Sequence, residues 1–146
     1  MLSNTHFSIA VHVLTALAYH EHEEPAPVGS SMLAKTVGTN PSFLRGLIGR
    51  LRDAGLVETV LGKGGGTRLA LSPSRITLHD VYRATVSQPA LKTHPCSETS
   101  PCLVAAGMRS LLSDINSRLE LAVAAELEQI TVQNLLDSYY RCGNES

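Results

Sequence analysis

The sequence predicts a mainly α-helical fold with one small β-hairpin wing, arranged as a winged helix-turn-helix followed by a long C-terminal dimerisation helix. Three observations predict it. Apolar residues recur at helical spacing along most of the chain, a glycine-rich hairpin lies near the middle, and a long apolar stripe follows. This pattern divides the 146 residues into a winged helix-turn-helix domain at 1–86, a cysteine-containing loop at 87–102, and a dimerisation helix with a C-terminal helix at 103–146.

Composition agrees with a folded domain. Hydrophobic residues make up 43% of the chain and charged residues 17%, so the chain can bury a core. No apolar run approaches the roughly 18 residues of a membrane span. The first residues also lack the basic stretch that opens a signal peptide. Three cysteines imply no disulfide framework. We therefore expect a cytoplasmic protein without membrane contact.

Two helices open the chain. An apolar run with helical spacing predicts the first helix over 5–20, and a loop with two prolines follows it. A shorter helix is predicted over 30–37. Either Ser30 or Ser31 could cap its start, and Gly38 ends it.

The third helix has the clearest start. Asn40 is a favoured N-cap, Pro41 suits the first helical position, and Gly55 stops the helix. Its buried stripe consists of Leu44, Leu47, Ile48 and Leu51. Its other face offers Ser42, Arg45, Gly46, Gly49 and Arg52. Each glycine costs roughly 1 kcal/mol relative to alanine inside a helix. The two glycines therefore indicate either close approach of the helix backbone to DNA or no special role.

A glycine-rich hairpin follows the third helix. Residues 56–61 and 67–71 are predicted strands, joined by a loop at 62–66. This loop is not a P-loop, because a strand rather than a helix follows its last glycine. Four glycines in five residues exceed what a turn needs. That excess favours a wing lying against DNA over a plain flexible tip. The expected wing contacts are Lys63, Gly64, Gly65, Gly66, Thr67 and Arg68.

The second half of the chain is predicted as three helices and one long loop. A capping box at Thr77 starts a helix that ends near 86, and Thr131 could cap the last helix. Between them lie a proline-containing loop at 87–101 and a helix over 103–127, about 37 Å long. A domain of this size cannot cover such a helix, so part of its stripe is expected on a second copy. The expected dimer-interface residues are Val104, Met108, Leu111, Leu112, Ile115, Leu119 and Ala122.

The charge distribution favours a nucleic-acid partner. Residues 35–83 hold eight basic side chains against three acidic ones, a balance of +5, although the whole chain carries −1. A solvated charged face is the alternative interpretation. In a helix-turn-helix the second helix enters the major groove, where the guanidinium of Arg45 would fit guanine. Besides the wing, the expected DNA contacts are Ser31, Asn40, Pro41, Ser42, Arg45, Gly46, Gly49 and Arg52.

These motifs occur together in a known family. The leucines of the third helix with Gly55-Leu56-Val57, the wing glycines, and Ile76-Thr-Leu-His-Asp-Val81 resemble the Rrf-type family of bacterial regulators, which includes IscR, NsrR and CymR. The resemblance covers nearly the whole chain. It implies a non-enzymatic transcriptional regulator that binds a pseudo-palindromic operator as a homodimer, and we expect a repressor. Leu61 and Thr67 depart from the family, which often has an arginine and an aromatic residue there.

The resemblance also directs attention to the cysteines. Cys96 and Cys102 match the last two of three cluster cysteines in several members, but the other expected ligand positions are Ala90 and Ala105. Iron–sulfur clusters need a full set of mainly thiolate ligands, so no cofactor is expected. The alternative is a cluster whose missing ligands come from His94, Cys142 or the second copy. The spacing of the two cysteines matches the usual spacing of zinc ligands only loosely, so no metal is expected. A thiol switch is another interpretation, because a helix N-terminus lowers the pKa of a thiol such as that of Cys102. The third interpretation is that the cysteines have no sensing role.

Two other functional classes fit less well. A thiol–disulfide enzyme would need a C-x-x-C motif on a βαβ unit, and no Ser/His/Asp or paired-carboxylate motif indicates another enzyme. A module for protein partners would leave the local positive balance and the glycine wing unexplained. We therefore predict a sequence-specific DNA-binding regulator with double-stranded DNA and a second copy as partners and no small-molecule substrate. Modulation through the redox state of Cys96 and Cys102 is a further hypothesis.

Overall fold

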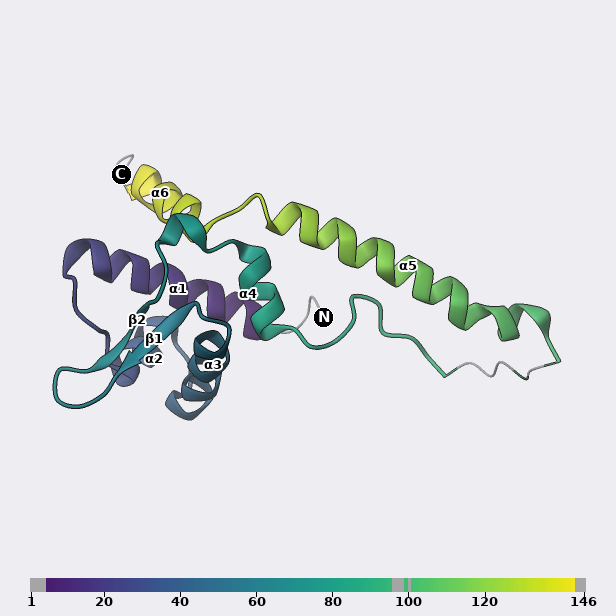
Figure 1. Cartoon of the computed structure of the whole chain (residues 1–146), viewed down its shortest axis with the longest axis horizontal. Helices are drawn as coiled ribbons and strands as arrows, with labels where there is room; N and C mark the ends of the chain where they lie inside the picture. The colour runs from purple at the N-terminus through teal and green to yellow at the C-terminus, as the bar shows by residue number, and fades with distance from the viewer. Residues whose placement is uncertain (1–4, 96–98, 100, 144–146) are drawn as a thin grey trace.

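The computed structural model describes residues 5–95, 99 and 101–143. This part of the chain forms a helical body with a hairpin at one side and a long helix at the other (Figure 1). Among these residues no helix combines the length and apolar character that a membrane crossing requires. The predicted fold class is confirmed. The elements are α1 (Thr5–Glu23), α2 (Ser30–Val37), α3 (Pro41–Asp53), β1 (Val57–Val60), β2 (Gly66–Leu69), the 3-10 turn η1 (Pro73–Arg75), α4 (Leu78–Thr85), α5 (Leu103–Leu127) and α6 (Val132–Gly143).

Helix α1 is the centre of the core. It contacts α2, α3, α4, α6 and β2. The spacing of its apolar residues matches the 3.6-residue helical period, which puts them on one buried face. Burying each large aliphatic side chain stabilises the fold by about 1.5–3 kcal/mol. The largest fully buried side chains are Leu14, Leu33, Leu44, Leu51, Ile76, Val13, Val81 and Val132.

The caps of α3, α4 and α6 follow from local sequence. The Asn40 side chain accepts a hydrogen bond from the Ser42 amide at 2.8 Å, which confirms it as the N-cap of α3. Thr77 and Asp80 exchange hydrogen bonds at 3.0 and 3.1 Å in the expected capping box of α4. Thr131 and Asn134 exchange an equivalent pair at the start of α6 (2.8 and 3.1 Å).

The predicted cap of α2 is wrong. Gly29, rather than Ser30 or Ser31, is the N-cap residue, and no side chain caps the helix there. The reason lies outside the local sequence. Val28 is held in an extended bridge to Thr67 by two backbone hydrogen bonds of 2.9 and 2.8 Å, so the helix begins directly after this bridge.

The wing is a two-stranded antiparallel hairpin in which Val57 pairs with Leu69 and Val60 with Gly66. Its glycines serve the turn itself, which corrects the prediction that four glycines exceed what the turn needs. Gly62 and Gly64 have φ values of 90° and 79°, and Gly66 one of 155°. A Cβ on Gly65 would collide with the carbonyl of Val60. The glycine content of this loop is therefore explained within the protein.

Helix α6 belongs to the helix-turn-helix body. Its Val132 and Leu136 are part of the buried core, and it packs on α1 and η1. Two backbone hydrogen bonds hold its start, from Leu78 to Ile130 (2.8 Å) and from Val132 to Ile76 (3.0 Å). The predicted unit at 103–146 is thus divided, because α5 projects away while α6 returns to α1 (Figure 1).

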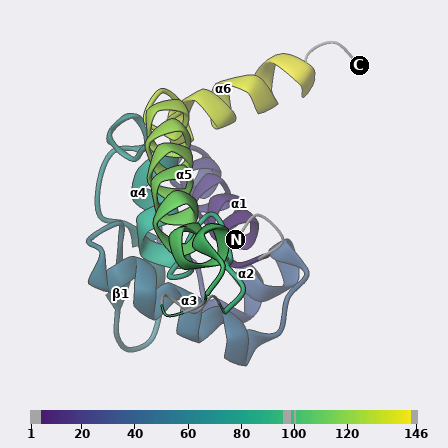
Figure 2. The same cartoon turned by 90° about the vertical axis from the view of Figure 1, so that its right-hand side faces the viewer.

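Helix α5 is the one long element that the body does not cover. It has the bounds predicted from its apolar stripe, yet none of its 25 residues is buried. Figure 2 shows it in front of the other helices, with its C-terminal end beside α6. It contacts the body at α4 and at the loop that follows α4.

The close approach of Val28 to Gly66 generates a stability prediction. A Cβ on Gly66 would lie 2.5 Å from the carbonyl carbon and oxygen of Val28. Gly66→Ala should therefore lower the free energy of unfolding by about 3 kcal/mol, because overpacking is added to backbone strain. Gly64→Ala is the matched control. Its Cβ would meet no atom within 4 Å, so only strain of about 1 kcal/mol is expected. Equal losses for both variants in urea denaturation would contradict this account.

Candidate nucleic-acid interface

The exposed face of α3 is a stripe of small residues bordered by arginines. With 3.6 residues per turn, Ser42, Gly46, Gly49 and Asp53 lie opposite the buried leucines. The same geometry puts two arginines along one border of the stripe and a third along the other, and all three are exposed. These arginines are Arg45 and Arg52 on one border and Arg50 on the other.

Neither glycine of this stripe is required by packing within the described residues. A Cβ on Gly46 would meet no heavy atom within 4 Å, and one on Gly49 would meet only the end of the Arg52 side chain at 4.0 Å. The missing side chains therefore leave the α3 backbone accessible from outside. A partner such as the edge of a nucleic acid could approach it closely.

The three arginines differ in their surroundings. Arg52 lies 3.8 Å from the carboxylate of Asp53, whereas no hydrogen-bond or ion-pair partner is found for Arg45 within the described part of the chain. Sequence analysis missed Arg50. The signal was available, because Arg50 follows Gly46 by four residues and so extends the same exposed face.

A hollow of about 270 Å³ adjoins this face. It is lined by residues of α1 and α3, and the rings of His6 and Phe43 lie 5.0 Å apart at its edge. The N-terminus of α1 therefore borders the exposed surface of α3. The lining residues are His6, Ser42, Phe43, Gly46, Leu47 and Arg50.

One of the predicted wing contacts, Thr67, is corrected by the structure. Thr67 is only 3% exposed, and its backbone amide and carbonyl both bond to Val28, so its side chain is not available to DNA. Arg68 is ion-paired with Glu58, its cross-strand neighbour. Lys63 is exposed at the wing tip, beside Leu61, which is 90% exposed. The wing therefore presents two exposed basic side chains, Lys63 at its tip and the ion-paired Arg68 on β2.

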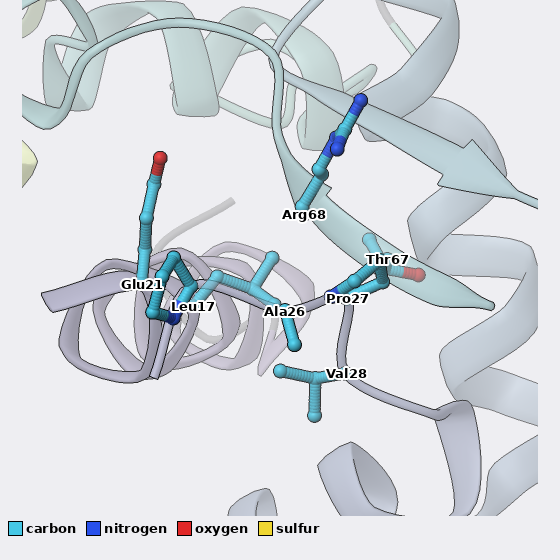
Figure 3. Close-up of a pocket in the computed structure, with 8 residues that line it drawn as sticks. Leu17, Glu21, Ala26, Pro27, Val28, Thr67 and Arg68 are labelled. Atoms are coloured by element: carbon cyan, nitrogen blue, oxygen red, sulfur yellow. The ribbon is translucent and has the colours of Figure 1, made fainter. Parts of the chain in front are cut away.

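The base of the wing encloses a pocket of about 100 Å³ between α1 and β2. Figure 3 shows Arg68 and Glu21 on opposite sides of it, with Val28 and Thr67 nearby. Its size is well below the roughly 300–1,000 Å³ of typical ligand pockets. We assign it to the packing of the wing on α1.

The remaining predicted contacts of the helix-turn-helix lie at helix starts. Ser31 is exposed in the first turn of α2, and Pro41 is exposed at the first position of α3. The Asn40 side-chain oxygen is already used, since it accepts hydrogen bonds from the amides of Ser42 and Phe43. Asn40 therefore positions α3 through its cap.

Cys102 lies where the sequence predicted, at the N-cap of α5, and is exposed. The backbone amides of Ala105 and Val104 lower the pKa of its thiol. Cys96 lies outside the described residues. The cluster-ligand positions at Ala90 and Ala105 have no ligating side-chain atoms, and the described residues contain no group of three or more metal-ligating side chains. Ala90 and Ala105 therefore supply no thiolate or imidazole donor to an iron–sulfur cluster.

In this fold α2 and α3 form the helix-turn-helix, and α3 is its second helix. A winged helix-turn-helix whose second helix is exposed and bordered by arginines is typical of DNA-binding proteins. This chain belongs to the Rrf2 family, whose description is "Iron-dependent Transcriptional regulator" and whose profile matches residues 3–138. The chain is therefore a DNA-binding transcriptional regulator, a non-enzymatic role.

The relatives and solved structures agree with this assignment. The HTH-type transcriptional regulator IscR of Aliivibrio salmonicida is 34% identical over 139 residues, covering 88% of this chain and 82% of that protein. NsrR of Bacillus subtilis is 27% identical and covers 84% of each chain. The structure of T. potens IscR matches with a TM-score of 0.68 at 26% identity over 93% of this chain and 86% of that one. CymR of B. subtilis matches with a TM-score of 0.65 at 25% identity, covering 92% and 95%.

The two kinds of basic residue should affect DNA binding differently. Arg45→Ala is expected to weaken binding to a preferred sequence by about 1–3 kcal/mol more than binding to random DNA, because a bidentate base contact is lost. Lys63→Ala should weaken both alike and lower the salt slope by about one charge, as for a phosphate contact. Fluorescence anisotropy with duplexes enriched from a random pool measures both effects. An unchanged specificity ratio in Arg45→Ala would disprove the assigned role of Arg45.

Proposed function

We propose that this protein is a homodimeric repressor that reads a pseudo-palindromic operator in the bacterial cytoplasm. The observation that carries the proposal is the exposed face of α3, where small residues are bordered by Arg45, Arg50 and Arg52. Such a face admits close contact with the major groove while the guanidinium groups reach bases or phosphates. Lys63 at the wing tip supplies a contact to the neighbouring backbone.

The proposed dimer is supported by the uncovered stripe of α5. Its apolar side chains recur every three or four residues, and several are largely exposed, among them Val104 at 66% and Leu111 at 56%. Contiguous exposed apolar surface of this kind marks an interaction site in a soluble protein. Among the predicted interface residues, Val104, Leu111, Ile115, Leu119 and Ala122 are exposed, while Met108 and Leu112 are partly buried.

A salt titration tests DNA binding against the alternative of a module for protein partners. If several basic residues contact phosphates, the logarithm of affinity for a random-sequence duplex falls linearly with the logarithm of salt concentration. We expect a slope of about −3 or steeper, since three arginines and Lys63 are available. A slope near zero would favour the protein-binding alternative.

The dimer interface is tested by a double substitution. Leu111→Glu with Ile115→Glu puts two charges into the stripe and should give monomers that bind DNA poorly, because desolvating a carboxylate is costly. Ser113→Glu with Ser117→Glu is the matched control, since these residues have the same spacing on another face of α5. Sedimentation velocity reports the oligomeric state. Dimers that persist unchanged in the leucine–isoleucine variant would rule out this interface.

We further propose that Cys102 acts as a redox-responsive thiol rather than as a cluster ligand. Its exposure and its lowered pKa favour the reactive thiolate. The thiolate would attack a peroxide, forming the S–O bond of a sulfenic acid as the O–O bond breaks and hydroxide leaves. Attack by the thiol of Cys96 would then form a disulfide and release water.

The acidity of Cys102 can be measured by alkylation across pH. The midpoint of iodoacetamide modification should lie at lower pH in the folded protein than in urea, because the amides of Ala105 and Val104 stabilise the folded thiolate. As pH falls through the folded pKa, the thiolate is protonated and this stabilisation is lost. Mass spectrometry resolves Cys102 from Cys96 and Cys142 in the same sample. Identical midpoints in folded and unfolded protein would remove the basis for a switch.

A further inference from the structure

One carboxylate connects three separate parts of the fold. The Glu120 side chain on α5 accepts a hydrogen bond from the backbone amide of Ala90 through Oε1 at 2.6 Å. Its Oε2 accepts one from the Tyr82 hydroxyl on α4 at 3.2 Å. The group is partly buried, and charged acceptors make the stronger hydrogen bonds. Glu120 therefore joins the loop after α4 to both α4 and α5.

A second side chain extends this connection by one residue. The Asn116 Oδ1 accepts a hydrogen bond from the Leu91 amide at 2.8 Å. Asn116 precedes Glu120 by four residues, so both lie on the same face of α5. Two consecutive backbone amides are thus held by two side chains one helical turn apart. We call Asn116, Glu120 and Tyr82 the α5 clamp.

Tyr82 connects the α5 clamp to the core of the DNA-binding domain. It is 8% exposed, and its ring meets Phe7 of α1 edge-on with centroids 6.1 Å apart. Burial and then the Glu120 carboxylate raise the pKa of its hydroxyl, so it remains a neutral donor. The Tyr82 ring also stacks on His79, which lies 3.3 Å from the carboxylate of Glu128 at the end of α5.

We propose that Glu120 is the positioning residue that sets the direction in which α5 leaves the DNA-binding domain, and thereby the distance between the two α3 helices of the dimer. This inference rests on the proposed homodimer. From Glu120 to the start of α5 the helix extends about 25 Å at 1.5 Å per residue. A tilt of roughly 10° at the α5 clamp would displace that end by about 4 Å, more than the 3.4 Å rise of one base pair. Half-site spacing is therefore sensitive to this contact.

The test is the spacing preference of the full-length dimer. Duplexes enriched by the wild-type protein are remade with the two half-sites one or two base pairs closer or farther apart. Glu120→Ala should reduce the preference for the original spacing at least threefold, while affinity for a single half-site and the sedimentation of the dimer stay unchanged. Glu120→Gln keeps a carbonyl acceptor and should retain most of the preference. Glu126→Ala, on an exposed position of the same helix, is the control.

The spacing preferences of these variants decide whether Glu120 positions α5. If Glu120→Ala keeps the full spacing preference of the wild type, or if the wild type has none, the positioning role is disproved. If Glu120→Ala does not fold, Tyr82→Phe removes only the donating hydroxyl and should weaken the same preference; an unchanged preference there also disproves it. Failure of the wild type to form dimers would instead overturn the proposed function, and sedimentation of the wild type detects this separately.

Discussion

The uncovered apolar stripe of α5 is the constraint on which the proposed dimeric arrangement depends. A 25-residue helix without one buried residue gains little stability from packing within its own chain. The body remains complete without it, because α6 returns to α1 and contributes Val132 and Leu136 to the core. Helix α5 is therefore a projecting arm that contacts the body through the C-terminal half of the helix. Its apolar surface is available for the proposed second copy.

In this arrangement the body and α5 have different roles. The body presents α3 and the wing to DNA, and its core, centred on α1, fixes their relative position. The arm determines how two bodies are held apart in the proposed dimer. Contacts between α4 and α5, such as Tyr82 with Glu120, lie at the junction of the two parts.

Sequence patterns predicted what depends on local chemistry. The bounds of α5, the cap at Asn40 and the capping box at Thr77 all follow from side chains within a few residues of one another. What the patterns missed depends on contacts between distant segments. The bridge from Val28 to Thr67 buries a residue expected at the DNA surface, and the ion pair between Arg68 and Glu58 joins neighbouring strands. Arg50 was overlooked although helical geometry alone could have identified it.

Selection of bound duplexes from a random-sequence pool, followed by sequencing, tests the central claim most directly, because it requires no known operator. The account predicts enrichment of two inverted half-sites whose centres are about one helical turn, or a multiple of it, apart, as expected for two recognition helices related by a two-fold axis. Enrichment of a single unpaired motif would contradict the dimeric arrangement through α5. No enrichment over the starting pool would contradict sequence-specific recognition by α3.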